Sequence, residues 1–392
     1  MRFIIFLAVF LSIYSSFHLY AFLKLRRALS LHLGTGAIIA VFMAFMVAAP
    51  ILIRTAERHG FELCARFLAY IGYTWMGFLF VFVSVAFVLD IYRFLIYGGR
   101  QIFAADLSAI TLSQQYSFYI SVLLAVIITA YGAFEAISIR TEHVIIRSEK
   151  IPKHVGRTRI VQISDVHLGL MVGEKRMARI LNRVRAAKPD ILVSTGDLFD
   201  GQMDSLAGLA RMLKEIPTTH GKFAITGNHE FYAGLEHFLD FAEKAGFIVL
   251  QQESLNVSGW LNIAGVDDVT AKRYGQTKNV SEKALLAKLP PGQFNLLLKH
   301  RPLVDEETPG LFDLQLSGHT HKGQIFPFSL ITMIYYPYIA GLINLGKNSR
   351  LYVSRGSGTW GPPIRFLAAP EVTLLELVHE DKTLIERKQN RE

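Results

Sequence analysis

Four long apolar segments lie in the first 134 residues, and none of them contains Asp, Glu, Lys or Arg. The hydrocarbon core of a bilayer is about 30 Å thick, so a helix needs about 20 apolar residues to cross it. A signal peptide would account for one such segment, whereas four in succession with one proline, Pro50, are not typical of a soluble core. We therefore predict that residues 1–140 form a transmembrane helical region, with spans over about 3–23, 36–53, 67–89 and 116–134.

The basic residues predict the orientation of these spans. Four spans place both ends of the region on one side, and the segment that follows carries Arg140, Arg147, Lys150, Lys153, Arg157 and Arg159. Basic loops favour the cytoplasmic side, so we expect a multi-pass cell-membrane protein with a cytoplasmic C-terminal domain. Lys24, Arg26 and Arg27 would then face outward, against the same rule. The net charge of +9 suits an anionic membrane surface or nucleic acid; the spans favour a lipid bilayer as partner, and we expect no nucleic acid.

The composition changes at about residue 156. Residues 174–187 place Met177, Ile180, Leu181 and Val184 on one helical face, and residues 235–245 are a second predicted helix. Short β-like runs lie between such segments, and this alternation is typical of an α/β domain. The predicted fold class is thus α + α/β, with a basic linker over 141–155 and an α/β domain over 156–385.

Five of the short β-like runs lead into residues that can bind metal or transfer protons. RIVQIS, ILVST, KFAIT, NLLLK and LQLS precede, in this order, Asp165 and His167; Asp197 and Asp200; Asn228, His229 and Glu230; His300; and His319 and His321. In α/β sheets, ligands collect beyond the carboxyl ends of the strands. We therefore expect these side chains to meet in one site.

The donor set predicts two divalent metal ions. Seven plausible ligands, Asp165, His167, Asp197, Asn228, His300, His319 and His321, are too many for one tetrahedral ion. They suit two ions that share a bridging carboxylate. Imidazole mixed with carboxylate favours Mn, Fe or Zn over Ca or Mg, and we expect manganese first. Cys64 is the only cysteine, so a thiolate cluster is excluded.

The ordered blocks resemble those of the calcineurin-like metallophosphoesterase superfamily. Asp-x-His, Gly-Asp-x-x-Asp, Gly-Asn-His-Glu, a later His and Gly-His-x-His follow one another over about 158–322. The stretch VSRGSGTWGPPIRF at 353–366 is similar to the tail of the membrane-associated bacterial subgroup, which usually has Gly where this chain has Lys322. The resemblance implies a two-sheet sandwich with outer helices, αββα.

The resemblance also implies a role for each block residue. Asp165, His167 and His321 would hold the first ion, Asn228, His300 and His319 the second, and Asp197 would bridge them. His229 would act as general acid near the leaving group without binding metal. Asp200 and Glu230 would orient histidines.

This site predicts a hydrolase in which metal-activated hydroxide cleaves a phosphoester or pyrophosphate bond of a phosphate-containing substrate. The apolar segment 325–341 is either buried core or a flap toward the bilayer that admits a lipid-linked substrate. Arg301, Arg355 and Arg365 either clamp phosphate or pair with structural carboxylates. Two alternatives stay open: a phosphodiesterase of soluble nucleotides for which the spans are only an anchor, and a non-catalytic metal-bound membrane scaffold or sensor. A scaffold has no use for His229, which favours an enzyme.

Overall fold

The computed structural model describes residues 2–104, 106–201, 206–276, 278 and 280–381. Its contacts divide the chain into two units. One contains the helices up to Phe134 together with Gly361–Ile364, and the other runs from Glu135 to Trp360 and resumes at Arg365. The predicted domain end at 385 lies outside the described residues.

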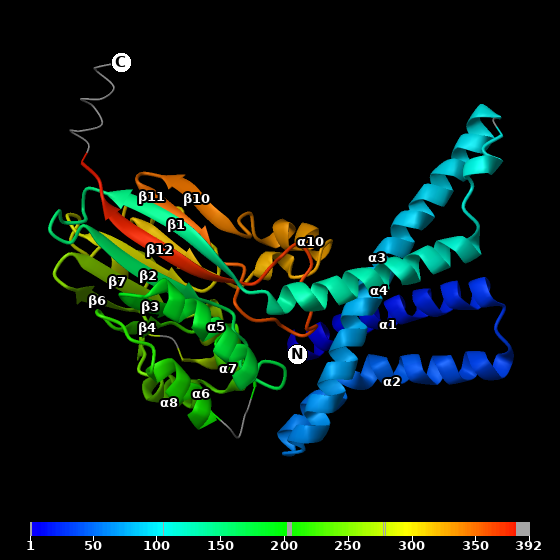
Figure 1. Ribbon diagram of the computed structural model, residues 1–392, viewed down its shortest axis with the longest axis horizontal. Coiled ribbons are helices and arrows are strands. Elements are labelled where there is room, and N and C mark those ends of the chain that lie inside the picture. The colour runs from blue at the N-terminus through cyan, green and yellow to red at the C-terminus, as the bar shows by residue number, and fades with distance from the viewer. Residues whose placement is uncertain (1, 105, 202–205, 277, 279, 382–392) are drawn as a thin grey trace. The chain divides into compact units, whose positions relative to one another are not determined.

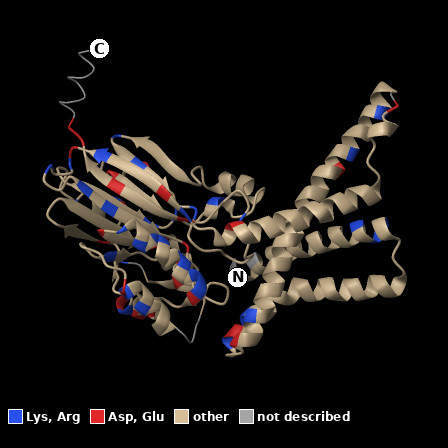
Figure 2. Ribbon diagram, in the orientation of Figure 1, with Lys and Arg blue, Asp and Glu red and all other residues tan. Residues whose placement is uncertain are grey.

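The first unit consists of helices, four of which are long and apolar enough to cross a membrane. They are α1 (Arg2–Leu29), α2 (Leu33–Arg58), α3 (Glu62–Phe103) and α4 (Gln114–Ile137), with a short turn η1 (Ser108–Ile110) before the last. Figure 2 shows them tan along most of their length, with charged residues gathered near helix ends and in the second half of α3. The helical part of the predicted fold class is confirmed.

Helix α3 is longer than the span predicted within it. Its 42 residues correspond to about 63 Å at 1.5 Å per residue, about twice the hydrocarbon thickness. The part beyond residue 89 carries Asp90, which accepts a hydrogen bond from the Tyr20 hydroxyl at 2.6 Å and pairs with Lys24 and Arg93. These partners satisfy the carboxylate without a break in the helix.

The second unit is a sandwich of two six-stranded sheets (Figure 1). The strand orders are β1-β12-β2-β3-β4-β5 and β10-β11-β9-β8-β7-β6. The strands are β1 (Arg140–Ser148), β2 (Arg157–Ile163), β3 (Ile191–Ser194), β4 (Lys222–Ala224), β5 (Ile248–Val249), β6 (Glu253–Val257), β7 (Leu261–Val266), β8 (Phe294–Lys299), β9 (Leu314–Ser317), β10 (Gly341–Gly346), β11 (Ser349–Val353) and β12 (Glu371–His379). The predicted two-sheet α/β sandwich is confirmed.

Helices cover the outer faces of both sheets. Side chains of α5, α6, α7 and α8 share one apolar cluster with the first sheet, and α9 packs on the second sheet. The helices are α5 (Glu174–Ala187), α6 (Leu206–Lys214), α7 (Asn228–Ala233), α8 (Leu235–Lys244), α9 (Glu282–Leu286) and α10 (Phe328–Tyr335), with 3-10 turns η2 (Val269–Tyr274) and η3 (His321–Gly323). The helices predicted over 174–187 and 235–245 are present as α5 and α8.

Strand β2 shows how the sequence builds these layers. Ile160 belongs to the cluster between the two sheets, whereas Val161 and Ile163 belong to the cluster beneath the helices. Successive side chains of a strand point to opposite faces. A strand buried on both faces therefore has apolar residues at nearly every position, which is why RIVQIS and ILVST could be assigned as strands.

The segment predicted as a basic linker contributes a strand. Arg140–Ser148 forms β1, which pairs in parallel with β12 from Arg140 opposite Glu371 to Ser148 opposite His379. Its Ile146 is buried between the sheets, while Arg140 and Arg147 are exposed. Val144 packs against the same cluster as Ile146 and Ile145 between them is exposed, which fits an edge strand with one buried face, so this segment belongs to the sandwich.

Candidate metal centre

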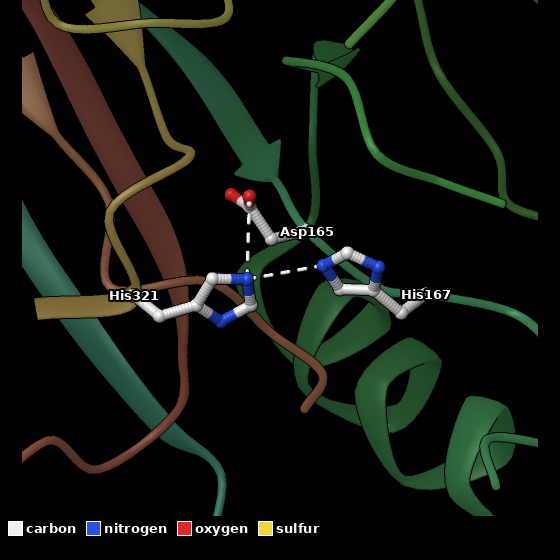
Figure 3. Close-up of side chains that lie close together, drawn as sticks. All are labelled: Asp165, His167 and His321. Atoms are coloured by element: carbon white, nitrogen blue, oxygen red, sulfur yellow. Dashed lines mark hydrogen bonds and ion pairs between the residues drawn. The ribbon is translucent and has the colours of Figure 1, made fainter. Parts of the chain in front are cut away.

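Three donors from two sheets meet in a first group (Figure 3). Asp165 and His167 follow β2, and His321 follows β9. The His321 Nε2 atom lies 3.0 Å from His167 Nε2 and 3.5 Å from Asp165 Oδ1. Donor atoms of the three buried side chains lie within 4.8 Å of one another. The group can hold one metal ion.

A second group lies next to the first. His300 Nε2 is 3.2 Å from Asp197 Oδ2 and 3.1 Å from His319 Nδ1. Asp197 Oδ2 is also 4.0 Å from His167 Nε2 of the first group. One carboxylate oxygen therefore lies near donors of both groups, which is the position that a bridging ligand requires.

Asn228 begins α7, and its backbone lies beside the second group. The next amide, that of His229, donates to Asp197 Oδ1 at 2.9 Å. The Asn228 Oδ1 atom is buried and has no hydrogen-bond partner among the described residues. A buried oxygen without a partner is costly, and a divalent ion at the second group would be a natural partner for it.

Several contacts fix which histidine nitrogen faces the centre. His300 donates from Nδ1 to the Thr195 carbonyl at 2.8 Å, so Nε2 is the nitrogen that faces the centre. His319 turns Nδ1 to the centre and places Nε2 2.8 Å from the Tyr336 hydroxyl. No sequence pattern indicated Tyr336 as a site residue, because its contact depends on how the chain returns after α10.

Five of the candidate ligands have a backbone conformation that side chains rarely adopt. Their φ angles are positive: 51° for Asp165, 55° for His167, 51° for Asp197, 70° for His319 and 47° for His321. Such a conformation costs about 1–3 kcal/mol at each residue. Strain concentrated on the residues that converge indicates a site whose side-chain directions matter more than local stability.

Burial and charge decide the protonation of these groups. Burial lowers the pKa of His319 to about 3, with the cations of His300 and Arg301 adding to the effect. A neutral imidazole is the form that binds metal. Burial would raise the pKa of the Asp197 carboxyl, but neighbouring His300 holds it well below its usual range. The bridging candidate is therefore ionised.

His229 lies beside the centre and is held by an acid. Its Nδ1 is 2.7 Å from Asp200 Oδ1, and its ring centroid is 4.7 Å from that of His167. Burial would lower the His229 pKa, but Asp197 and Asp200 outweigh burial and raise it to about 9. This protonated imidazole suits a proton donor. Asp200 thus contacts histidine as predicted.

Glu230 was predicted to orient a histidine, and this prediction is wrong because its partners are backbone amides. Its carboxylate accepts hydrogen bonds from the backbone amides of Asp197 at 3.0 Å, Leu198 at 2.7 Å and Gly227 at 2.6 Å. It therefore holds the loops after β3 and β4 against each other. Short-range motif reading could not show this, because the acceptor lies more than 30 residues from two of its donors.

The three arginines that were candidates for phosphate binding have structural partners. Arg301 donates to Asp268 at 2.6 and 3.1 Å. Arg355 pairs with Glu142 and Glu371. Arg365 is buried and donates to the carbonyls of Gly358, Arg355, Ala368 and His321 and to His321 Nδ1.

The site thus brings together Asp165, His167, Asp197, His300, His319 and His321, with Asn228 and His229 at its side. The donor set of imidazole, carboxylate and one orphaned amide oxygen fits a pair of divalent ions. Which of the two ions each residue would bind stays a prediction.

Several known proteins are similar to this chain. A family model described as calcineurin-like phosphoesterase matches residues 158–323. An "Uncharacterized metallophosphoesterase" of Aquifex aeolicus is 40% identical over 256 residues, which cover 65% of this chain and 97% of that protein. A "Transmembrane protein with metallophosphoesterase domain" of Danio rerio is 32% identical over 350 residues, 83% of this chain and 79% of that protein.

The "Uncharacterized metallophosphoesterase YkuE" of Bacillus subtilis is 33% identical over 249 residues, 60% of this chain and 84% of that protein. These similarities agree with the two-sheet sandwich and with the converging donors after β2, β3, β4, β8 and β9. The four apolar helices and the Danio rerio relative also support a membrane protein. The chain belongs to the calcineurin-like metallophosphoesterase family.

Proposed function

We propose that this protein is a membrane-anchored phosphoesterase that uses two divalent ions, manganese first, with iron or zinc as alternatives. The main support for this proposal is the position of Asp197, whose Oδ2 atom lies 3.2 Å from His300 Nε2 and 4.0 Å from His167 Nε2. A carboxylate between two groups of donors supports a pair of ions rather than two independent sites. A non-catalytic scaffold gives no reason for the His229–Asp200 pair.

Bound ions of this kind lower the pKa of water and offset charge on phosphoryl oxygens. The protein's own residues supply the remaining steps. Asp200 fixes Nδ1 of His229, so Nε2 is the nitrogen that can give a proton to the leaving oxygen as the P–O bond breaks. The oxygen of water forms the new bond to phosphorus. The products are a phosphate or its monoester and a protonated leaving group.

The exposed surface of α10 supports a lipid-linked substrate. Ile334 and Tyr335 have exposed fractions of 78% and 73%, and Leu330 and Met333 are also exposed. Tyr336 follows directly and contacts His319. A large exposed apolar surface needs a partner, and an acyl or prenyl chain of the substrate would cover it while the phosphate lies at the metal centre. Exposure of α10 speaks against the buried-core interpretation of segment 325–341.

The experiment uses the full-length protein in detergent, loaded with Mn²⁺, and measures hydrolysis of bis-p-nitrophenyl phosphate. We expect Asp197→Ala and His229→Ala to lower kcat by at least about 100-fold, while His237→Ala, an exposed histidine on α8, keeps wild-type turnover. Undiminished hydrolysis by either site variant would refute the assignment.

The lipid-linked part is tested separately on the same protein. Ile334→Ser with Tyr335→Ser should lower kcat/KM for a long-chain lipid phosphodiester and leave hydrolysis of bis-p-nitrophenyl phosphate unchanged. Equal activity on the lipid substrate would instead favour a soluble nucleotide as substrate, with the helices as an anchor only.

A further inference from the structure

We propose that Trp360 and Tyr232 form an aromatic wall beside His229 that binds the leaving group of the substrate and favours a leaving group with a flat ring. This inference rests on the proposed phosphoesterase function. The Trp360 side chain is not among the candidate metal ligands.

Both rings contact the imidazole of His229. The ring centroid of Tyr232 is 5.4 Å and that of Trp360 is 6.2 Å from the imidazole centroid, with interplanar angles of 66° and 76°. Because Asp200 occupies Nδ1 of His229, the leaving oxygen has to approach Nε2. The group attached to that oxygen must therefore lie near the rings that surround the imidazole.

The two rings are only half covered by the protein. The exposed fractions are 51% for Trp360 and 45% for Tyr232. Both face solvent next to a proton donor, where a flat ring of the substrate can stack. Removal of an aromatic residue that stacks on a base weakens binding by about 1–3 kcal/mol, which corresponds to about 5- to 150-fold in affinity.

The backbone of Trp360 is fixed to the metal-binding loops. Gln324 clamps it with two hydrogen bonds, from the Trp360 amide to Oε1 at 2.9 Å and from Nε2 to the Trp360 carbonyl at 2.8 Å. The amide of Gly358 donates to the Asp165 carbonyl at 3.0 Å. A Cβ atom at Gly358 would lie 2.0 Å from the Val166 carbonyl oxygen, so glycine permits this approach. A ring on so fixed a backbone loses little entropy on binding.

The aromatic wall is tested with two diesters on the Mn²⁺-loaded full-length protein in detergent. One is ethyl p-nitrophenyl phosphate, with a flat leaving group, and the other is ethyl trifluoroethyl phosphate, with an alkyl leaving group. The ratio of variant to wild-type kcat/KM is taken on each substrate separately, so the intrinsic reactivity of the leaving group cancels.

We expect Trp360→Ala and Tyr232→Ala to lower kcat/KM about tenfold on the aryl diester and less than about twofold on the alkyl diester. Trp360→Phe and Tyr232→Phe keep a ring and should retain most of the aryl preference. Equal losses on both diesters, or no loss on either, would overturn the proposal, because the rings would then only support His229 or do nothing.

Two controls keep the outcome decisive. If wild-type protein hydrolyses neither diester, the phosphoesterase function fails rather than the aromatic wall. If an alanine variant does not fold, phenylphosphonate and cyclohexylphosphonate are compared as inhibitors of wild-type protein. The flat compound should bind at least about fivefold more tightly, and equal inhibition would overturn the proposal.

Discussion

Tyr336 is the residue that ties α10 to the metal centre. Its hydroxyl lies 2.8 Å from His319 Nε2 and accepts a hydrogen bond from Arg301 Nη1 at 3.3 Å. Arg301 is itself held by Asp268. Since His319 turns Nδ1 to the centre, its Nε2 carries the proton and donates to Tyr336. This outer contact fixes both the tautomer and the ring direction of a candidate ligand.

Removal of the Tyr336 hydroxyl should therefore weaken metal binding. Loss of an outer-shell partner typically costs about 10- to 100-fold in metal affinity, and we expect at least about tenfold weaker Mn²⁺ binding for Tyr336→Phe by isothermal titration of metal-free protein. The matched control is Tyr335→Phe, which removes a hydroxyl from the exposed neighbour. Equal affinity of the two variants would show that Tyr336 does not position His319.

Arg365 is a buried residue that joins several backbone segments near the metal centre. It donates to the carbonyls of Gly358, Arg355 and Ala368. Arg365→Met leaves these acceptors without a donor, at about 1–3 kcal/mol each. We expect a loss of about 3 kcal/mol or more and a Tm lower by about 6 °C or more in thermal unfolding in detergent. Arg183→Met, at an exposed position of α5, should leave the Tm unchanged, and equal Tm values for the two variants would contradict this role.

The sequence could predict the donors of the site but not what positions them. Asp165, Asp197 and the histidines follow strands in recognisable blocks. Tyr336 and Arg365 act through contacts between segments that are 17 and 44 residues apart, and no local pattern encodes such contacts. Glu230 was recognised, like His229, because it lies in the Gly-Asn-His-Glu block. Its partners, however, are backbone amides.

At the scale of elements, the segment between β11 and β12 contacts the loop after β2 that carries Asp165. Its Ser357 amide donates to the Ser164 carbonyl at 2.7 Å, and its Gly358 amide donates to the Asp165 carbonyl. This segment therefore runs alongside the end of β2 as if it extended the sheet. The close approach depends on the absence of a side chain at Gly358.

Gly358→Ala should separate this segment from the loop that carries Asp165. The added Cβ atom would meet the Val166 carbonyl oxygen at 2.0 Å, and rigid backbone has to shift. We expect weaker Mn²⁺ binding and a Tm lower by several degrees. Gly292→Ala is the control, because nothing lies within 4 Å of its Cβ position. Identical metal affinity in the two variants would show that the segment does not support the site.

Element boundaries were harder to predict than element types. The strands that precede the site and helix α5 could be assigned because the spacing of their apolar residues and the residues that flank them indicate the same element type. Residues 141–155 were predicted as a basic linker, although Val144 and the buried Ile146 lie two residues apart with the exposed Ile145 between them. Its pairing with β12, more than 220 residues later in the chain, is a long-range contact that composition does not show.

At the scale of the whole molecule, Cys64 allows a test of the predicted orientation. It is the only cysteine and is exposed near the start of α3. The basic residues predict a cytoplasmic position for this end of α3 and for the metallophosphoesterase domain. In intact cells, a membrane-impermeant maleimide should leave Cys64 unlabelled until the membrane is permeabilised.

The matched control moves the cysteine to the other side. Ser30→Cys in a Cys64→Ser background places it between α1 and α2, where we expect labelling in intact cells. The reverse pattern would place the metallophosphoesterase domain outside the cytoplasm. The chemistry proposed for the metal centre would be unaffected, but the accessible substrates would differ.

Loops from two sheets are proposed to hold a pair of metal ions. Anomalous diffraction from crystals of the Mn²⁺-loaded protein tests this proposal most directly. We expect two peaks about 3.5–4 Å apart, one beside Asp165 and His321 and one beside His300 and His319, with the Asp197 carboxylate between them. A single peak, or manganese bound away from these side chains, would contradict it.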